Sequence, residues 1–132
     1  FHTMHHEFAH ILHQTKNYST EYRQITEGKY VGDNWYQISL RQALQNGFIS
    51  NYSMSYPDED FVEVFSRYLT YSPFEWNYLL EIAGDTGKPL ITRKFNIVKS
   101  YLEDSWNIDI EILRSVVQRR TNTIFEIDLD NL

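Results

Sequence analysis

The chain has 132 residues, of which 42% are hydrophobic and 16% aromatic, and this size and composition suit one compact domain. The formal net charge is −6 and the Lys and Arg residues are scattered, so the charge pattern does not favour a nucleic-acid or anionic-membrane partner. Because the chain has no Cys, disulfides and thiolate metal sites are excluded, and any metal must be bound by His and carboxylate side chains. No apolar run approaches the roughly 20 residues that a membrane-spanning helix needs, so this chain is not expected to insert into a membrane.

A first helix is predicted from Thr3 to Gln14 or Thr15, and it contains the pattern H-E-x-x-H from His6 to His10. Two imidazoles four residues apart lie one turn apart on the same helix face, so both can direct a ring nitrogen at one zinc ion. Glu7 stands between them and can reach a water molecule beside the metal. The motif therefore predicts a zinc site with Glu7 as a general base. The alternative is a solvated, His-rich helix face that binds no metal.

A helical wheel divides this helix into two sides. His6, His10 and His13 fall within one narrow arc, and the opposite side carries apolar residues: Met4, Phe8, Ile11 and Leu12. We expect the apolar side to pack in the core and the His side to face the metal. His13 lies one turn beyond His10, and it is predicted to line the pocket or to be exposed rather than to bind the metal.

The next part of the chain lacks a clear period. Glycines and aromatic residues alternate from Glu21 to Ile38, which predicts a long irregular loop that could include a short strand. A short helix is then predicted from Leu40 to Asn46, with Ser39 as its N-cap and Gly47 as its left-handed stop.

Four further main helices are predicted in the rest of the chain. One begins at Ser55-Tyr56-Pro57 and ends near Thr70, and the next begins at the capping box of Ser72 and stops at Gly84. Apolar residues at helical spacing predict two more, over residues 90–102 and 110–117, joined near Asn107. The acidic tail over residues 123–132 is expected to be a short edge strand or loose. The sequence thus predicts a mainly α fold, the motif helix plus about four further helices with little strand.

A catalytic zinc needs a third protein ligand and an open position. Glu59 and Glu63 share one arc of the helix that ends near Thr70, while the opposite side of that helix is apolar. Either carboxylate could complete the zinc site, and a solvated helix face is the alternative. Asp60 is predicted to be a plain surface carboxylate.

The sequence resembles a family of zinc-binding metallopeptidases found as lipoproteins in gut Bacteroidota, also described as substrate import-associated zinc metallohydrolases. The resemblance rests on three segments, 6–14 (HEFAHILHQ), 50–52 (SNY) and 59–65 (EDFVEVF), and it extends to residues 106–114. It therefore spans nearly the whole chain.

The resemblance assigns roles that the wheel leaves open. In the related lethal-factor-like zincins, the Glu that opens a similar E-x-F-x-E segment is the third zinc ligand, and a Tyr upstream assists catalysis. By resemblance, Glu59 matches the ligand, Glu63 a supporting carboxylate and Tyr52 the catalytic Tyr, although Tyr56 also lies upstream.

These residues together predict a zinc-dependent hydrolase of peptide bonds. Zn²⁺ would be bound by His6, His10 and Glu59, with Glu7 as base and Tyr52 as donor to the developing oxyanion. The alternative function is a non-catalytic, metal-containing domain of a surface lipoprotein that assists nutrient capture. The oligomeric state cannot be read from these residues.

The position of the motif suggests how the chain relates to a larger protein. The motif begins close to Phe1, whereas the motif helix of such hydrolases normally packs under a sheet formed by earlier sequence. We therefore expect residues 1–132 to form a single metallopeptidase-like domain, the C-terminal part of a longer protein. The family resemblance implies an exported, periplasmic or cell-surface lipoprotein with a possible N-terminal lipid anchor outside this chain, acting on a peptide or protein substrate.

Overall fold

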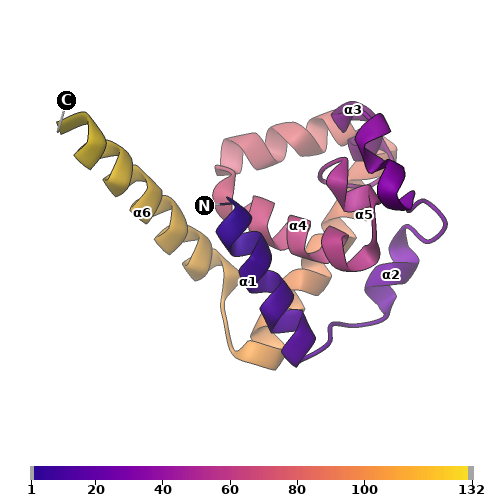
Figure 1. The fold of residues 1–132 in the computed structure, drawn as a ribbon, viewed down its shortest axis with the longest axis horizontal. Coiled ribbons are helices and arrows are strands. Elements are labelled where there is room, and N and C mark those ends of the chain that lie inside the picture. Colours follow the sequence, from indigo (N-terminus) through magenta and orange to yellow (C-terminus); the bar gives the residue numbers. More distant parts are fainter. Residues whose placement is uncertain (1, 131–132) are drawn as a thin grey trace.

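The computed structural model describes residues 2–130, with side chains as far as residue 121, and this part of the chain is mainly helical without a strand. Figure 1 shows its helices, which are α1 (His2–Thr15), α2 (Glu21–Ile25), α3 (Leu40–Gln45), α4 (Pro57–Thr70), α5 (Pro73–Trp106) and α6 (Ile110–Asp130). Two 3₁₀ turns, η1 (Gly32–Gln37) and η2 (Tyr52–Met54), complete the fold. The predicted mainly α fold is confirmed.

Short sequence signals predicted several helix boundaries correctly. The hydroxyl of Ser72 accepts a hydrogen bond from the backbone N–H of Glu75 at 3.1 Å, and the Glu75 carboxylate accepts one from the backbone N–H of Ser72. At Gly84 the backbone of α5 is not helical, with φ at 70°, so the helix is broken at the predicted stop. Asn107 ends α5 in a left-handed conformation with φ at 53°, at the predicted joint.

Two segments differ from their predictions. The segment from Glu21 to Ile38 holds α2 and η1 rather than an irregular loop with a strand. Tyr22 is fully buried, so tertiary packing stabilises a helix too short to be recognised from its period. The tail also differs, because α6 continues through residue 130 instead of forming a strand or a loose end. Residues 131–132 lie outside the described part of the chain.

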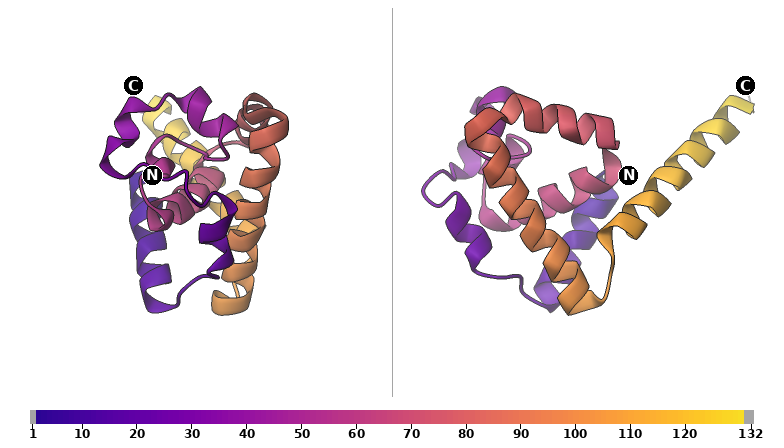
Figure 2. Two further views of the ribbon diagram at one scale, coloured as in Figure 1. Left: turned by 90° about the vertical axis from the view of Figure 1, so that its right-hand side faces the viewer. Right: turned by 180° about the vertical axis from the view of Figure 1, so that it is seen from behind.

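Helix α4 occupies the centre of the fold. It contacts α1, α2, α5 and α6, and its residues 60–66 are buried without interruption. Figure 2 shows the second segment of α5 crossing the body, while the later part of α6 extends away from it. None of the helices in the described part of the chain combines the length and apolar character of a bilayer span.

Helix α1 packs on α4 by a different side than predicted. Ala9 and Leu12 are buried in the core, whereas three residues of the predicted core side are exposed: Met4 to 59%, Phe8 to 45% and Ile11 to 59%. The buried side of α1 includes His6 and His13. The prediction was wrong for these residues because the wheel locates an apolar face but not the neighbour that covers it.

A buried ion pair fixes α4 against α5. The ammonium of Lys94 lies 2.8 Å from a carboxylate oxygen of Asp60, and neither side chain is exposed to solvent. The same ammonium donates a hydrogen bond to the carbonyl of Gly47 and lies 3.7 Å from the ring centroid of Phe48, while Tyr30 donates to Asp60. Burial raises the pKa of Asp60 and lowers that of Lys94. The prediction of a surface carboxylate at Asp60 was therefore wrong.

Replacing Lys94 with Met in the full-length protein should reduce the free energy of unfolding by about 3–5 kcal/mol, because the charge of Asp60 would remain buried without its cation. Urea unfolding measures this loss. Lys88→Met, at an exposed position of the same helix, is the matched control and should change stability by no more than about 0.5 kcal/mol. Equal effects of the two substitutions would contradict a structural role for the pair.

Candidate metal centre

The packing of α1 on α4 brings together three side chains that the sequence analysis assigned to zinc. The Nε2 atoms of His6 and His10 are 3.2 Å apart. A carboxylate oxygen of Glu59 lies 2.9 Å from Nε2 of His6, and its other oxygen lies 3.1 Å from Nε2 of His10. These three residues form a group whose ligand atoms could bind one metal ion.

The donor set and its spacing fit zinc. Tetrahedral zinc with bonds of about 2.0–2.2 Å separates its ligand atoms by roughly 3.3–3.5 Å. The separations in this group, 2.9 to 3.2 Å, are only slightly shorter, so small side-chain movements would admit the ion. Two imidazoles and one carboxylate also leave the fourth position of a tetrahedral site open, as in catalytic zinc sites.

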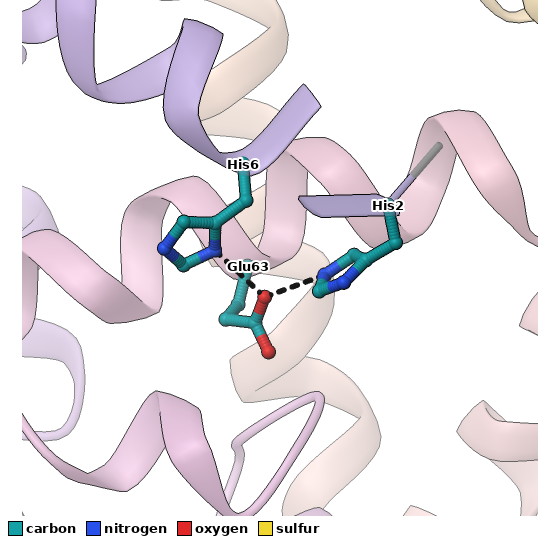
Figure 3. A group of neighbouring side chains, drawn as sticks. All are labelled: His2, His6 and Glu63. Atoms are coloured by element: carbon teal, nitrogen blue, oxygen red, sulfur yellow. Dashed lines mark hydrogen bonds and ion pairs between the residues drawn. The ribbon is translucent and has the colours of Figure 1, made fainter. Parts of the chain in front are cut away.

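Glu63 lies behind His6, on the side away from Glu59. One of its carboxylate oxygens is 3.0 Å from Nδ1 of His6 and 2.7 Å from Nε2 of His2 (Figure 3). The other oxygen accepts a hydrogen bond from the hydroxyl of Ser50 and lies 3.5 Å from Arg67. Glu63 thus contacts Nδ1 of His6, the ring nitrogen that does not face Glu59.

The pKa shifts of Glu63 and His6 match this geometry. Burial alone would raise the pKa of Glu63, but the hydrogen bond from His6 and the charges of Arg67 and His2 lower it to about 2. Burial likewise acts to lower the pKa of His6, yet the hydrogen bond and charge of Glu63, together with the charge of Glu59, raise it. At neutral pH, Glu63 is therefore an anion next to His6.

His10 has a different neighbour. Its Nδ1 atom lies 2.9 Å from Nε2 of His13, which is only 6% exposed. The ring of His13 packs edge-on against Tyr18 and Phe61, and burial lowers its pKa. The prediction that His13 would be exposed or would line the pocket was wrong, because the packing of α1 on α4 covers it.

Glu7 and Tyr52 lie beside His6. Together with His2, Thr3, His6 and Glu63 they line a hollow of about 230 Å³. The ring centroid of Tyr52 is 5.9 Å from that of His6. Burial and the nearby carboxylates, foremost Glu59, raise the pKa of Tyr52 to about 12.

Tyr56, the alternative to Tyr52, points elsewhere. It is 49% exposed and its hydroxyl donates a hydrogen bond to Asp33 at 2.9 Å. The structure therefore places Tyr52 beside the His and Glu residues, and Tyr56 away from them.

At the level of sequence, His2 was missed, and His13 was placed on the metal face but not recognised as the neighbour of Nδ1 of His10. His2 stands four residues before His6, the same spacing that identified the motif, and His13 stands three residues after His10. His2, His6 and Glu63 form a second group whose atoms could approach a metal ion. That group needs Nδ1 of His6 as a ligand, and a neutral imidazole offers only one lone pair, so it competes with the first group for His6.

Comparisons with known proteins identify the family of this chain. The family described as "Putative zinc-binding metallo-peptidase" matches residues 1–111 of the chain. The crystal structure of a putative zinc-binding metallo-peptidase from Bacteroides caccae ATCC 43185 is 46% identical in sequence and superposes with a TM-score of 0.93. The similarity covers 98% of this chain and 50% of the Bacteroides chain, so the chain spans half the length of that protein. The search of curated proteins found no match.

The pKa directions of two histidines can be tested in the zinc-free protein. His6 should titrate above its ordinary pKa of about 6.5 and His13 below it, because only His6 has anionic partners in direct contact. Glu63→Gln should lower the midpoint of His6 and leave that of His13 in place. The ring proton shifts in NMR spectra recorded across pH report both midpoints. A His6 midpoint at or below that of His13 would contradict the arrangement.

Proposed function

Because the chain belongs to the family of "putative zinc-binding metallo-peptidases", we propose that it forms the metal-binding part of a zinc-dependent peptidase. The observation that carries this proposal is the convergence of Nε2 of His6, Nε2 of His10 and the Glu59 carboxylate, with Glu7 at a hollow that His6 also lines. A structural zinc site has no need of a carboxylate next to an open position, whereas a hydrolase requires one.

His6, His10 and Glu59 would hold the zinc. When bound, zinc supplies a Lewis acid that polarises the scissile carbonyl and acidifies a water molecule. Glu63 keeps the proton of His6 on Nδ1, so that Nε2 presents its lone pair toward Glu59 and His10. The ligands are thereby oriented before the metal arrives.

Glu7 acts as the general base in this proposal. It is exposed at the edge of the hollow and is not one of the three convergent ligands, so its carboxylate is free to accept a proton. Glu7 takes the proton from the attacking water and returns it to the amine that leaves when the peptide bond breaks. Water adds to the carbonyl carbon, and the C–N bond breaks.

Tyr52 stabilises the negative charge that develops on the carbonyl oxygen. With a pKa of about 12 it keeps its phenolic proton at neutral pH, so it can donate a hydrogen bond there. Trp35 packs edge-on against the Tyr52 ring, with centroids 5.0 Å apart, and restricts its movement.

The exposed side of α1 suggests how the site is completed. Met4, Phe8 and Ile11 form an exposed apolar strip along α1, and exposed strips of this kind mark contact surfaces. Consistent with a longer protein, we place further residues of the same polypeptide over this strip, where they would form the other wall of a cleft for a peptide or protein. The expected location of this protein is outside the cytoplasm.

Glu7→Gln in the full-length protein should reduce peptide hydrolysis by about 10²- to 10⁴-fold, because the variant lacks the base but keeps every ligand. Zinc content, measured by atomic absorption, should stay near one ion per chain. Loss of the metal in this variant would contradict the role of Glu7. Zinc binding without hydrolysis by the unmodified protein would favour a non-catalytic surface domain instead.

Glu59 and Glu63 should differ in zinc titrations. Glu59→Ala removes a ligand and should weaken zinc binding by orders of magnitude, because two imidazoles alone bind zinc poorly. Glu63→Ala removes only the partner of His6 and should cost about 10- to 100-fold. Competition with a chelator measures both affinities. A larger loss for Glu63→Ala would reverse the two assignments.

A further inference from the structure

The two imidazoles of the motif are held by chemically different partners. Nδ1 of His6 faces the carboxylate of Glu63 at 3.0 Å, whereas Nδ1 of His10 faces Nε2 of His13 at 2.9 Å. Among the described residues, His13 is the hydrogen-bond partner of Nδ1 of His10. The orientation of His10 therefore depends on a contact that the motif H-E-x-x-H does not contain.

The hydrogen bond has only one possible direction when His10 binds a metal. A ligand nitrogen must offer its lone pair, and Nε2 of His10 is the nitrogen that faces His6 and Glu59. The ring proton of His10 must then lie on Nδ1 and be donated to His13. A buried donor without an acceptor costs about 1–3 kcal/mol, so the acceptor at His13 matters to the metal-bound state.

The surroundings of His13 hold its ring in place. It is 6% exposed, and the rings of Tyr18 and Phe61 lie edge-on to it with centroids 5.8 and 6.3 Å away. Tyr18 in turn stacks on Phe61 at 4.1 Å. The acceptor nitrogen is thus fixed by packing between α1 and α4 rather than by solvent.

We infer that His13 is a positioning residue for His10: its Nε2 accepts the Nδ1 proton of His10 and so fixes the tautomer and the ring orientation that bind zinc. The inference rests on the zinc assignment of the proposed function but not on peptidase activity. One ligand of the site would then be held by an anion and the other by a neutral ring.

Zinc affinity tests this role in the full-length protein. His13→Phe keeps a flat ring between Tyr18 and Phe61 but lacks an acceptor, and it should weaken zinc binding by about 10- to 100-fold. His13→Gln places an amide oxygen near the position of Nε2 and should recover most of the affinity. His5→Phe changes a half-buried histidine of the same helix, outside both groups that could bind a metal, and should leave the affinity unchanged.

Two further measurements separate positioning from packing. The stability of zinc-free His13→Phe should equal or exceed that of the unmodified protein, because an apolar ring replaces a buried polar one. In the zinc-loaded protein, long-range ¹H–¹⁵N NMR spectra should place the shared proton on Nδ1 of His10, with a coupling across the hydrogen bond to Nε2 of His13.

Three results would overturn the inference. The first is zinc binding by His13→Phe as tight as in the unmodified protein, and the second is a shared proton on Nε2 of His13. The third is that His13→Phe and His13→Gln lose the same zinc affinity as each other and the same stability as each other. A protein that binds zinc but cleaves no peptide would overturn the proposed peptidase activity and leave the role of His13 intact. Failure of the unmodified protein to bind zinc would overturn both.

Discussion

The ion pair of Lys94 and Asp60 is the constraint on which the candidate metal centre depends. Two charges that are fully shielded from solvent must be matched by each other and by further hydrogen bonds, and Tyr30 and the carbonyl of Gly47 provide these. The pair therefore fixes both the position and the rotation of α4. Because successive residues of a helix are about 100° apart, a fixed Asp60 also determines where Glu59 points.

The four carboxylates in the first half of α4 all have partners, and two of them share His6. Asp58 accepts hydrogen bonds from Tyr18 and Arg23, Asp60 pairs with Lys94, and Glu59 and Glu63 both face the histidines of α1. Without these partners, so many acidic side chains in a buried helix would repel one another and lose their hydration. The histidines of α1 therefore contribute to the fold as well as to the candidate metal site, which explains why α1 packs on α4 by the side that carries them.

This arrangement also explains what the sequence could predict. Signals that act within one turn of helix, such as the capping box at Ser72 and the breaks at Gly84 and Asn107, predicted the boundaries correctly because they need no distant partner. The motif from His6 to His10 was recognised for the same reason. Asp60 and His13 were not assigned correctly, because the burial of each also depends on a residue far away in the chain, Lys94 for Asp60 and Phe61 for His13.

The helical wheel of α1 shows most clearly what the sequence could not predict. Met4, Phe8 and Ile11 are apolar but exposed, while the polar His6 and His13 are buried. An apolar stripe normally indicates the buried side of a helix, but burial is decided by whichever side has satisfied partners and a neighbour. In this helix the carboxylates of α4 satisfy one side, and the apolar stripe faces outward.

The placement of Glu7 follows from the same helix geometry. It is adjacent to His6 in sequence, so its side chain is rotated by about 100° from that of His6 and emerges at the edge of the buried side. There it borders the hollow together with Tyr52 and His6. A helix with one buried polar side can thus hold ligands within the protein and present a base to solvent one residue later. In the proposed function, the ligands are positioned by packing and Glu7 already borders the hollow, so both groups can be in place before a substrate binds.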